Sequence, residues 1–207
     1  PGFKSLFGSG IATFQNGDEV RSSLASNNSP VYTENELRQL TGDLNGFALE
    51  LYNRIKDETG ADNFIFSPHS FSVALAMTYS GARGNTEAQM ARVLRFNFPQ
   101  ERLHELFNAL NLELTNRGTG QTNTGNRYFR LNRADSLWAQ GGHPFLSPFL
   151  DNLAVNYDAG VWLADFQNNP DQARIAINNW VSRQTENRIN DLLGRGSIGE
   201  FTRLVLV

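Results

Sequence analysis

The sequence contains no cysteine, which excludes disulfide bonds, thiolate zinc sites and cysteine nucleophiles but does not fix the cellular compartment. Lysine is also scarce, occurring only at Lys4 and Lys56, and the arginines are dispersed along the chain. With a formal net charge of −3, nothing electrostatic favours nucleic acid or an anionic membrane as a partner. No segment approaches the ~18 consecutive apolar residues of a transmembrane helix.

Residue patterns for catalysis or metal binding are absent as well. The three histidines, His69, His104 and His143, fall in separate predicted elements, and no pair has the spacing of metal ligands. No G-x-S-x-G elbow, phosphate-binding P-loop or H-E-x-x-H motif occurs. We therefore expect no enzymatic activity, no cofactor and no metal ion.

What is present is the composition of a folded globular protein. Of 207 residues, 40% are hydrophobic and 19% are charged, and fifteen Phe and three Trp provide material for a substantial core. Residues 1–42 differ, because they are rich in Gly, Ser and Asn and include the linker-like string SSLASNNSP. Two interpretations stand for this leader: a flexible extension, or an arm that docks through its apolar residues, namely Phe3, Leu6, Phe7, Ile11 and Phe14.

Regular patterning begins at Asp43. Apolar residues from Leu44 to Ile55 recur at the spacing of one helix face, and the apolar run 63–66 predicts a short strand. Ser67 followed by Pro68 is typical of a helix start, with Ser as the N-cap and Pro at the first helical position. The helix that follows is apolar or small almost all round, which predicts burial on every side.

The rest of the chain alternates helices and strands, so the predicted class is α+β. We expect helices at 86–94 (opened by a Thr86–Gln89 capping box), 99–116, 145–157 and 171–193, and strands at 128–138, 161–166 and 202–207. The inner face of the helix at 171–193 is predicted to comprise Ile177, Trp180, Val181, Ile189 and Leu192. The chain ends on a β-prone run, TRLVLV, where natural domains seldom end, so we expect it to be part of a longer protein.

Seven blocks of the sequence, in order, resemble the serpins, a family of serine protease inhibitors. The resemblance covers residues 43–207 as the N-terminal part of a single domain. It is carried by NGFALELY (45–52), NFIFSPHS (63–70), ALAM with SGARGNT (74–77 and 80–86), DSLW (135–138), INNWV (177–181), RINDLL (188–193) and TRLVLV (202–207). Arg188 and Phe71 depart mildly from residues common in the family.

The resemblance implies a truncated serpin fold of N-terminal helices and part of a large central sheet, called sheet A. In the family this fold is metastable and acts as a conformational switch: a reactive loop near the C-terminus is cleaved by a serine protease and inserts into sheet A. We expect that loop, and the C-terminal half that carries it, to lie beyond Val207. The partner implied for the parent is therefore a serine protease, or a cysteine protease, bound by a monomer.

Within the chain, the resemblance gives roles to two groups of residues. Ser67 and Ser70 match the shutter, the region under sheet A where its strands must part. Thr202, Leu204 and Leu206 match the strand that borders the insertion gap, and the helix at 171–193 matches the one that lies across sheet A. For each, a cap or core residue remains the alternative interpretation.

Three further expectations accompany the resemblance. The helix at 99–117 lies where some serpins bind heparin, but its mixture of Arg102, His104 and Arg117 with acidic residues does not favour such a cofactor. An extracellular location is expected from the family, although no signal peptide is visible in this chain. The alternative function is that of a non-inhibitory serpin acting as a binding, carrier or chaperone-like protein.

Overall fold

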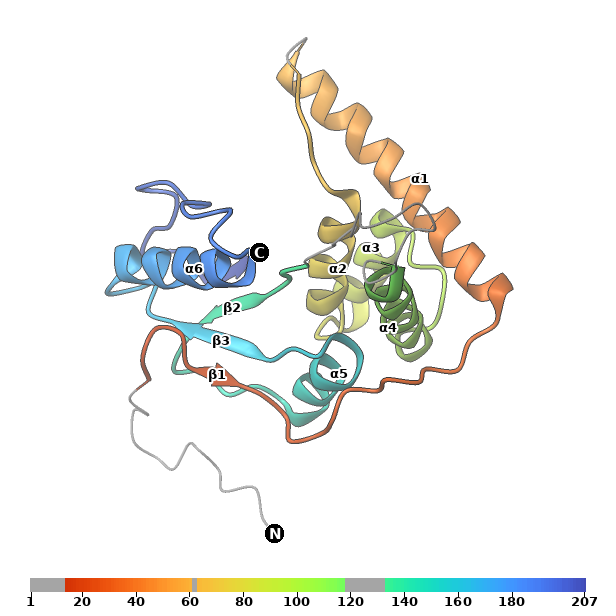
Figure 1. Ribbon diagram of the computed structural model, residues 1–207, viewed down its shortest axis with the longest axis horizontal. Helices are drawn as coiled ribbons and strands as arrows, with labels where there is room; N and C mark the ends of the chain where they lie inside the picture. Colours follow the sequence, from red (N-terminus) through yellow and green to blue (C-terminus); the bar gives the residue numbers. More distant parts are fainter. Residues whose placement is uncertain (1–13, 61–62, 118–132) are drawn as a thin grey trace, which may run out of the picture. The chain divides into compact units, whose positions relative to one another are not determined.

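The computed structural model describes residues 14–60, 63–117 and 133–207, and these divide into two compact units. The sheet unit contains residues 14–23, 133–151 and 159–207. The helical unit contains residues 24–60, 63–117 and 152–158. Helices and strands occur together (Figure 1), which confirms the predicted α+β class.

Four strands form one mixed sheet within the described residues. Their order is β1 (Glu19–Val20), β3 (Val161–Ala164), β2 (Leu137–Gln140) and β4 (Leu204–Leu206). The two central strands are parallel, and each edge strand is antiparallel to its neighbour. The predicted strands at 128–138 and 202–207 therefore do share a sheet, although the first begins only at Leu137; residues 128–132 lie outside the described residues.

Helix α6 (Pro170–Gln184) packs against this sheet through one apolar face. Ala173, Ile177, Trp180 and Val181 on α6 are buried in one cluster with Trp138 of β2 and Ala164 of β3. Figure 1 shows α6 beside β2 and β3, with the chain continuing beyond the helix to the C-terminus. Burial of this face, at ~25 cal/mol per Å² of apolar surface, is the main force that holds the helix there.

The helical unit is built from α1 (Glu34–Thr59), α2 (Pro68–Tyr79), α3 (Gly84–Leu94) and α4 (Gln100–Arg117), and α1 contacts the other three. The last turns of α1 extend beyond its partners (Figure 1). Helix α2 is buried from Ser72 to Tyr79 except for half-buried Leu75 and Thr78, but Ser70 and Phe71 are exposed. Burial on every side, predicted for this helix, thus holds only after its first turn. Helix α5 (Ser147–Tyr157) agrees with the predicted helix at 145–157.

Two helix starts differ from the prediction. Helix α1 begins at Glu34 rather than Asp43, because Thr33 and Glu36 form a capping box: the Glu36 N–H donates to Thr33 Oγ1 and the Thr33 N–H to the Glu36 carboxylate. Helix α3 begins at Gly84 after Arg83, whose side chain makes no capping bond, so the predicted Thr86–Gln89 box is wrong.

Two other elements are shorter or absent. Residues 63–66 form no strand, since a strand needs a neighbour for its backbone hydrogen bonds and none lies beside this segment among the described residues. The helix predicted over 171–193 ends at Gln184. Glu186 and Asn187 there adopt left-handed conformations with φ of 53° and 61°, which a right-handed helix cannot continue through. Ile189 and Leu192, predicted as buried, are therefore 44% and 47% exposed.

None of the helices in the described part of the chain is both long enough and apolar enough to span a lipid bilayer.

Candidate functional site

Ser67 and Ser70 lie at the N-terminus of α2, where the sequence placed them. Ser67 caps the helix: its hydroxyl accepts from the Ser70 N–H at 3.3 Å and donates to the Ser70 hydroxyl at 3.1 Å. Pro68 occupies the first helical turn, where its missing N–H leaves no bond unmade. Both hydroxyls are exposed, and they bind each other and the backbone. Capping is thus confirmed, while a shutter role for the pair remains a prediction.

Strand β4 carries two of the other predicted site residues, Leu204 and Leu206. The predicted strand 202–207 begins only at Leu204, and Thr202 precedes it, with its N–H donating to the Gly199 carbonyl at 2.9 Å. Val205 and Val207 pack against the cluster under α6, so by the alternation of side chains along a strand Leu204 and Leu206 occupy the opposite face, where Leu204 is 41% exposed. In the described residues β4 is also an edge strand, with β2 as its one neighbour.

Three tryptophans connect the sheet to α6. Trp138 of β2 stacks on Trp162 of β3 with ring centroids 5.5 Å apart, and Trp180 of α6 meets both edge-on, at 6.4 and 6.1 Å. The indole N–H of Trp138 is satisfied by the Ser136 hydroxyl at 3.0 Å. These are all the tryptophans in the chain, so their fluorescence reports on the contact between α6 and the sheet.

Two polar side chains on α6 hold the segment that follows the helix, and the sequence analysis missed them. Asn178 donates to Asp191 Oδ1 and the Leu193 carbonyl, at 2.7 and 2.9 Å, and accepts from the Leu193 N–H at 2.9 Å. Arg174, one turn earlier, donates to the same carbonyl at 3.1 Å and to Asp171 at 2.8 Å. Both side chains are buried. Arg174 and Asn178 are four residues apart, which places them on one side of α6 beside its apolar face. This spacing was the one signal in the sequence that the two side chains could act together on a neighbouring segment.

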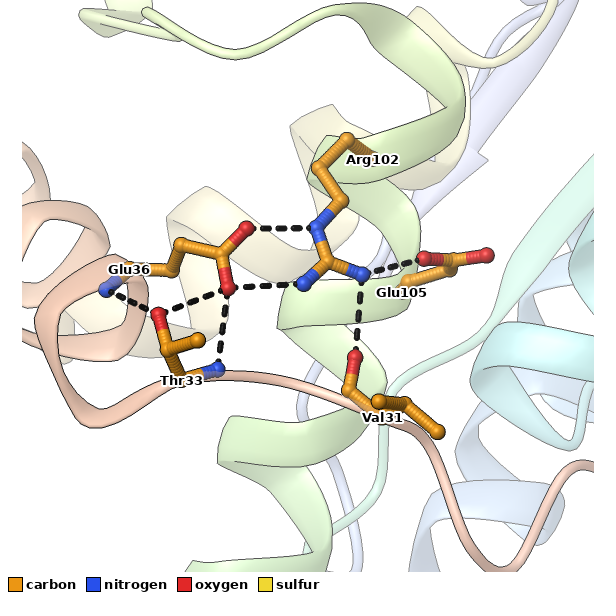
Figure 2. Close-up of polar contacts among 5 residues, drawn as sticks. All are labelled: Val31, Thr33, Glu36, Arg102 and Glu105. Atoms are coloured by element: carbon orange, nitrogen blue, oxygen red, sulfur yellow. Dashed lines mark hydrogen bonds and ion pairs between the residues drawn. The ribbon is translucent and has the colours of Figure 1, made fainter.

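In the helical unit, Arg102 of α4 is bound within the protein (Figure 2). Its guanidinium donates to both carboxylate oxygens of Glu36 at 2.8 Å, to Glu105 at 2.6 Å and to the Val31 carbonyl at 2.9 Å. The hydrogen bond from Arg102, followed by those from Thr33, lowers the pKa of Glu36 from 4.5 to about 2. Arg102 therefore joins the start of α1 to α4 instead of offering a charge to an external anion.

The other two basic residues on the helix where some serpins bind heparin also differ in environment. His104 is buried, and its Nδ1 lies 2.6 Å from the Tyr157 hydroxyl. Burial, with a smaller contribution from the nearby Arg83, lowers the pKa of His104 to about 3, so the ring is neutral at physiological pH. Arg117 at the end of α4 is exposed. One exposed arginine among the three is a weak basis for binding a polyanion.

Replacing Arg102 by methionine is expected to return the pKa of Glu36 toward 4.5. Because the folded-state pKa lies below the ordinary value, the stability from this contact is present above about pH 4.5 and is lost as the pH falls toward 2. The carboxyl ¹³C shift of Glu36, followed by NMR titration, measures this directly. Arg38→Met is the control, since Arg38 pairs with Glu34 on the exposed side of α1. An unchanged Glu36 titration in Arg102→Met would contradict the assignment.

Comparison with known proteins agrees with this fold. The family described as "Serpin (serine protease inhibitor)" matches residues 43–207. Leukocyte elastase inhibitor of Xenopus tropicalis is 37% identical over 161 residues, covering 78% of this chain and 41% of the relative. The Homo sapiens protein of that name is 36% identical over 171 residues, covering 83% and 43%. Uncleaved ovalbumin superposes with a TM-score of 0.65 at 30% identity, over 78% of this chain and 41% of that chain.

The chain is a member of the serpin family, and its fold is the N-terminal part of the serpin fold. It spans less than half the length of the relatives it matches. The predicted family is thereby confirmed. Residues 14–42, which include β1 and the start of α1, precede the matched range.

Proposed function

We propose that the protein to which this chain belongs inhibits a serine endopeptidase by inserting a cleaved reactive loop into the sheet that contains β1 to β4. The observation that carries the proposal is the family match together with relatives named as elastase inhibitors. The reactive loop is proposed to lie in the part of the relatives' length that this chain does not span. No residue of this chain is proposed to act chemically on the protease.

The geometry of the sheet unit supports the mechanism. Strand β4 has one neighbour in the described residues, so its outer backbone groups are placed to receive a further strand. Helix α6 packs on this sheet, and Val205 and Val207 of the β4 segment pack against the same cluster. A strand inserted next to β4 would therefore lie near α6. Loop insertion is a known way of releasing stored strain after a proteolytic trigger. Here α6 and its tryptophan cluster are the elements that would have to yield.

The test compares the full-length parent with residues 1–207. Each is incubated with leukocyte elastase and with a panel of other serine proteases, and the products are separated on denaturing gels. We expect the parent to form an SDS-resistant complex with at least one active protease and residues 1–207 to form none. The matched control is the same protease with its catalytic serine replaced by alanine, which cannot acylate.

Two outcomes would contradict the proposal. A covalent complex with residues 1–207 would mean that the protease-binding segment lies within this chain. Cleavage of the parent by every protease without any complex would favour the alternative, a non-inhibitory binding, carrier or chaperone-like serpin. An extracellular location and a monomeric parent remain predictions. Cell fractionation tests the first, and a mass measurement in solution tests the second.

A further inference from the structure

The outer edge of β3 is covered by residues 14–22 of this same chain, here named the strap. Strand β1 within the strap pairs antiparallel with β3, placing Glu19 opposite Trp162 and Val20 opposite Val161. The Gly17 N–H donates to the Leu163 carbonyl at 2.9 Å, and the Leu163 N–H donates to the Asp18 carbonyl at 2.7 Å. The edge of β3 is thus hydrogen-bonded along most of its length.

Side chains at both ends of the strap continue the pairing. The Asn16 amide oxygen accepts from the Asp165 N–H at 2.6 Å, just beyond the end of β3. Ser22 donates to the Asp151 carboxylate on α5 at 2.5 Å. The ring of Phe14 lies over Gly141 so closely that a β-carbon there would meet it at 2.2 Å. Of the apolar residues predicted to dock this leader, only Phe14 lies within the described residues, and it is docked; Phe3, Leu6, Phe7 and Ile11 lie outside them.

Without the strap, β3 would be an exposed edge of a kind that proteins avoid. Its residues, Val161–Ala164, are apolar throughout, and unpaired N–H and carbonyl groups on such a strand are a template for pairing with another chain. The strap replaces this edge with a strand of two residues flanked by Asp18 and Arg21 and containing Glu19. Short length and charge are the features by which natural edge strands resist association.

We propose that the strap is a detachable edge strand that keeps β3 from pairing with β3 of a second copy of this chain. Two identical strands that pair antiparallel are related by a two-fold axis, which gives a closed dimer. The strap lies outside residues 43–207, the range that the family matches.

One substitution displaces the strap selectively. Gly160 immediately precedes β3, and a β-carbon there would lie 2.7 Å from the Val20 carbonyl, 2.7 Å from Glu19 Oε1 and 2.9 Å from Arg21 Cβ. These three nearest atoms all belong to the strap, so Gly160→Ala pushes against the strap first. Gly199→Ala is the matched control in the same unit, because a β-carbon there meets nothing within 4 Å.

Two measurements on the full chain test the proposal together. Hydrogen exchange at the Leu163 amide should be at least about tenfold faster in Gly160→Ala than in wild type, while amides in α4 exchange as before. Light scattering after gel filtration should then show a concentration-dependent dimer in Gly160→Ala that wild type and Gly199→Ala do not form at the same concentration. The outer edge of β4 is identical in all three proteins, so only the difference between them reports on β3.

A milder variant, Asn16→Ala, removes only the side-chain acceptor for the Asp165 N–H. It should show a smaller rise in exchange and a smaller dimer fraction than Gly160→Ala. Faster Leu163 exchange with an unchanged mass would overturn the proposal, as would a Leu163 amide that is already unprotected in wild type. If Gly160→Ala also accelerates exchange in α4, the substitution disturbs more than the strap. The proposal is then tested by comparing Asn16→Ala with wild type in both Leu163 exchange and dimer fraction.

Discussion

Replacing Trp180 by alanine is expected to lower the free energy of unfolding by about 3–5 kcal/mol, the range for removing a buried aromatic side chain. Trp180 is 6% exposed and fills the space between α6 and the sheet, with its ring against both Trp138 and Trp162. Deleting it leaves a cavity bordered by the two rigid indoles of Trp138 and Trp162. Such walls relax little, which places the expected loss toward the upper end of the range.

Chemical denaturation followed by far-ultraviolet circular dichroism measures this loss without using the tryptophan signal that the substitution removes. Trp180→Phe is the matched variant, because it keeps an apolar ring in place and should lose less than half as much stability. Val93→Ala at a position 60% exposed serves as the surface control, with an expected change within about 0.5 kcal/mol. A loss below about 1 kcal/mol in Trp180→Ala would show that α6 is not held by this cluster.

The same substitution bears on the proposed function. If α6 has to leave the sheet while a reactive loop inserts, weakening its contact lowers the barrier to that step. In the full-length parent, Trp180→Ala should therefore form the protease complex faster than wild type while being less stable. Slower complex formation, with stability lost as expected, would indicate that α6 positions the inserting loop instead of obstructing it.

Local signals in the sequence predicted the elements whose ends depend on neighbouring residues. The N-cap at Ser67 placed the start of α2 correctly, and the apolar spacing in 99–116 placed both ends of α4 within one residue. A capping box at Thr33 and Glu36 was also present in the sequence, and the apolar spacing of the helix extends back to Leu37 and Leu40. These residues were assigned to the leader that is rich in Gly, Ser and Asn, and α1 was therefore started too late. Helix propensity is a weak guide to where a helix begins when the contact that stabilises that end is made with a distant part of the chain.

The parts that the sequence did not reveal depend on contacts between residues far apart in the chain. Arg102 and Glu36 are 66 residues apart, and Asn16 and Asp165 are 149 apart, so neither pair leaves a pattern in any short window. The end of α6 is similar: the apolar spacing continues to Leu192, but Asn178 and Arg174 draw the chain back at Leu193. The predicted residues on β4 were assigned from the family alone, and periodicity could not say which face meets α6.

A second large effect is expected from pH, through the buried pair of His104 and Tyr157. The folded-state pKa of His104, about 3, lies below its ordinary value of 6.5 because burial disfavours the charged ring. As the pH falls, His104 therefore binds a proton in the unfolded chain before it does so in the folded chain. The stability associated with neutral His104 is complete above about pH 6.5 and falls by about 1.4 kcal/mol per pH unit as the pH drops toward 3.

Two variants separate this titration from the hydrogen bond. Tyr157→Phe removes the hydroxyl 2.6 Å from Nδ1 but keeps a buried histidine, so it should lose about 1–3 kcal/mol at pH 7 and keep the wild-type pH dependence. The double variant with His104→Phe removes both polar groups, leaving an apolar ring pair beside Tyr79 and Phe107. Its stability at pH 7 should recover part of that loss.

The decisive quantity is the slope between pH 6.5 and 5, measured by urea denaturation, where most carboxylates remain ionised in both states. Wild type and Tyr157→Phe should lose stability in parallel over this window, and the double variant should lose about 1 kcal/mol per unit less than either, since His104 in the unfolded chain is half protonated at pH 6.5 and almost fully protonated at pH 5. His104 Nε2 has no hydrogen-bond partner among the described residues, so no neighbouring acceptor stabilises the protonated ring and softens the slope. Equal slopes in all three proteins would mean that His104 is protonated in the folded state as readily as in the unfolded chain.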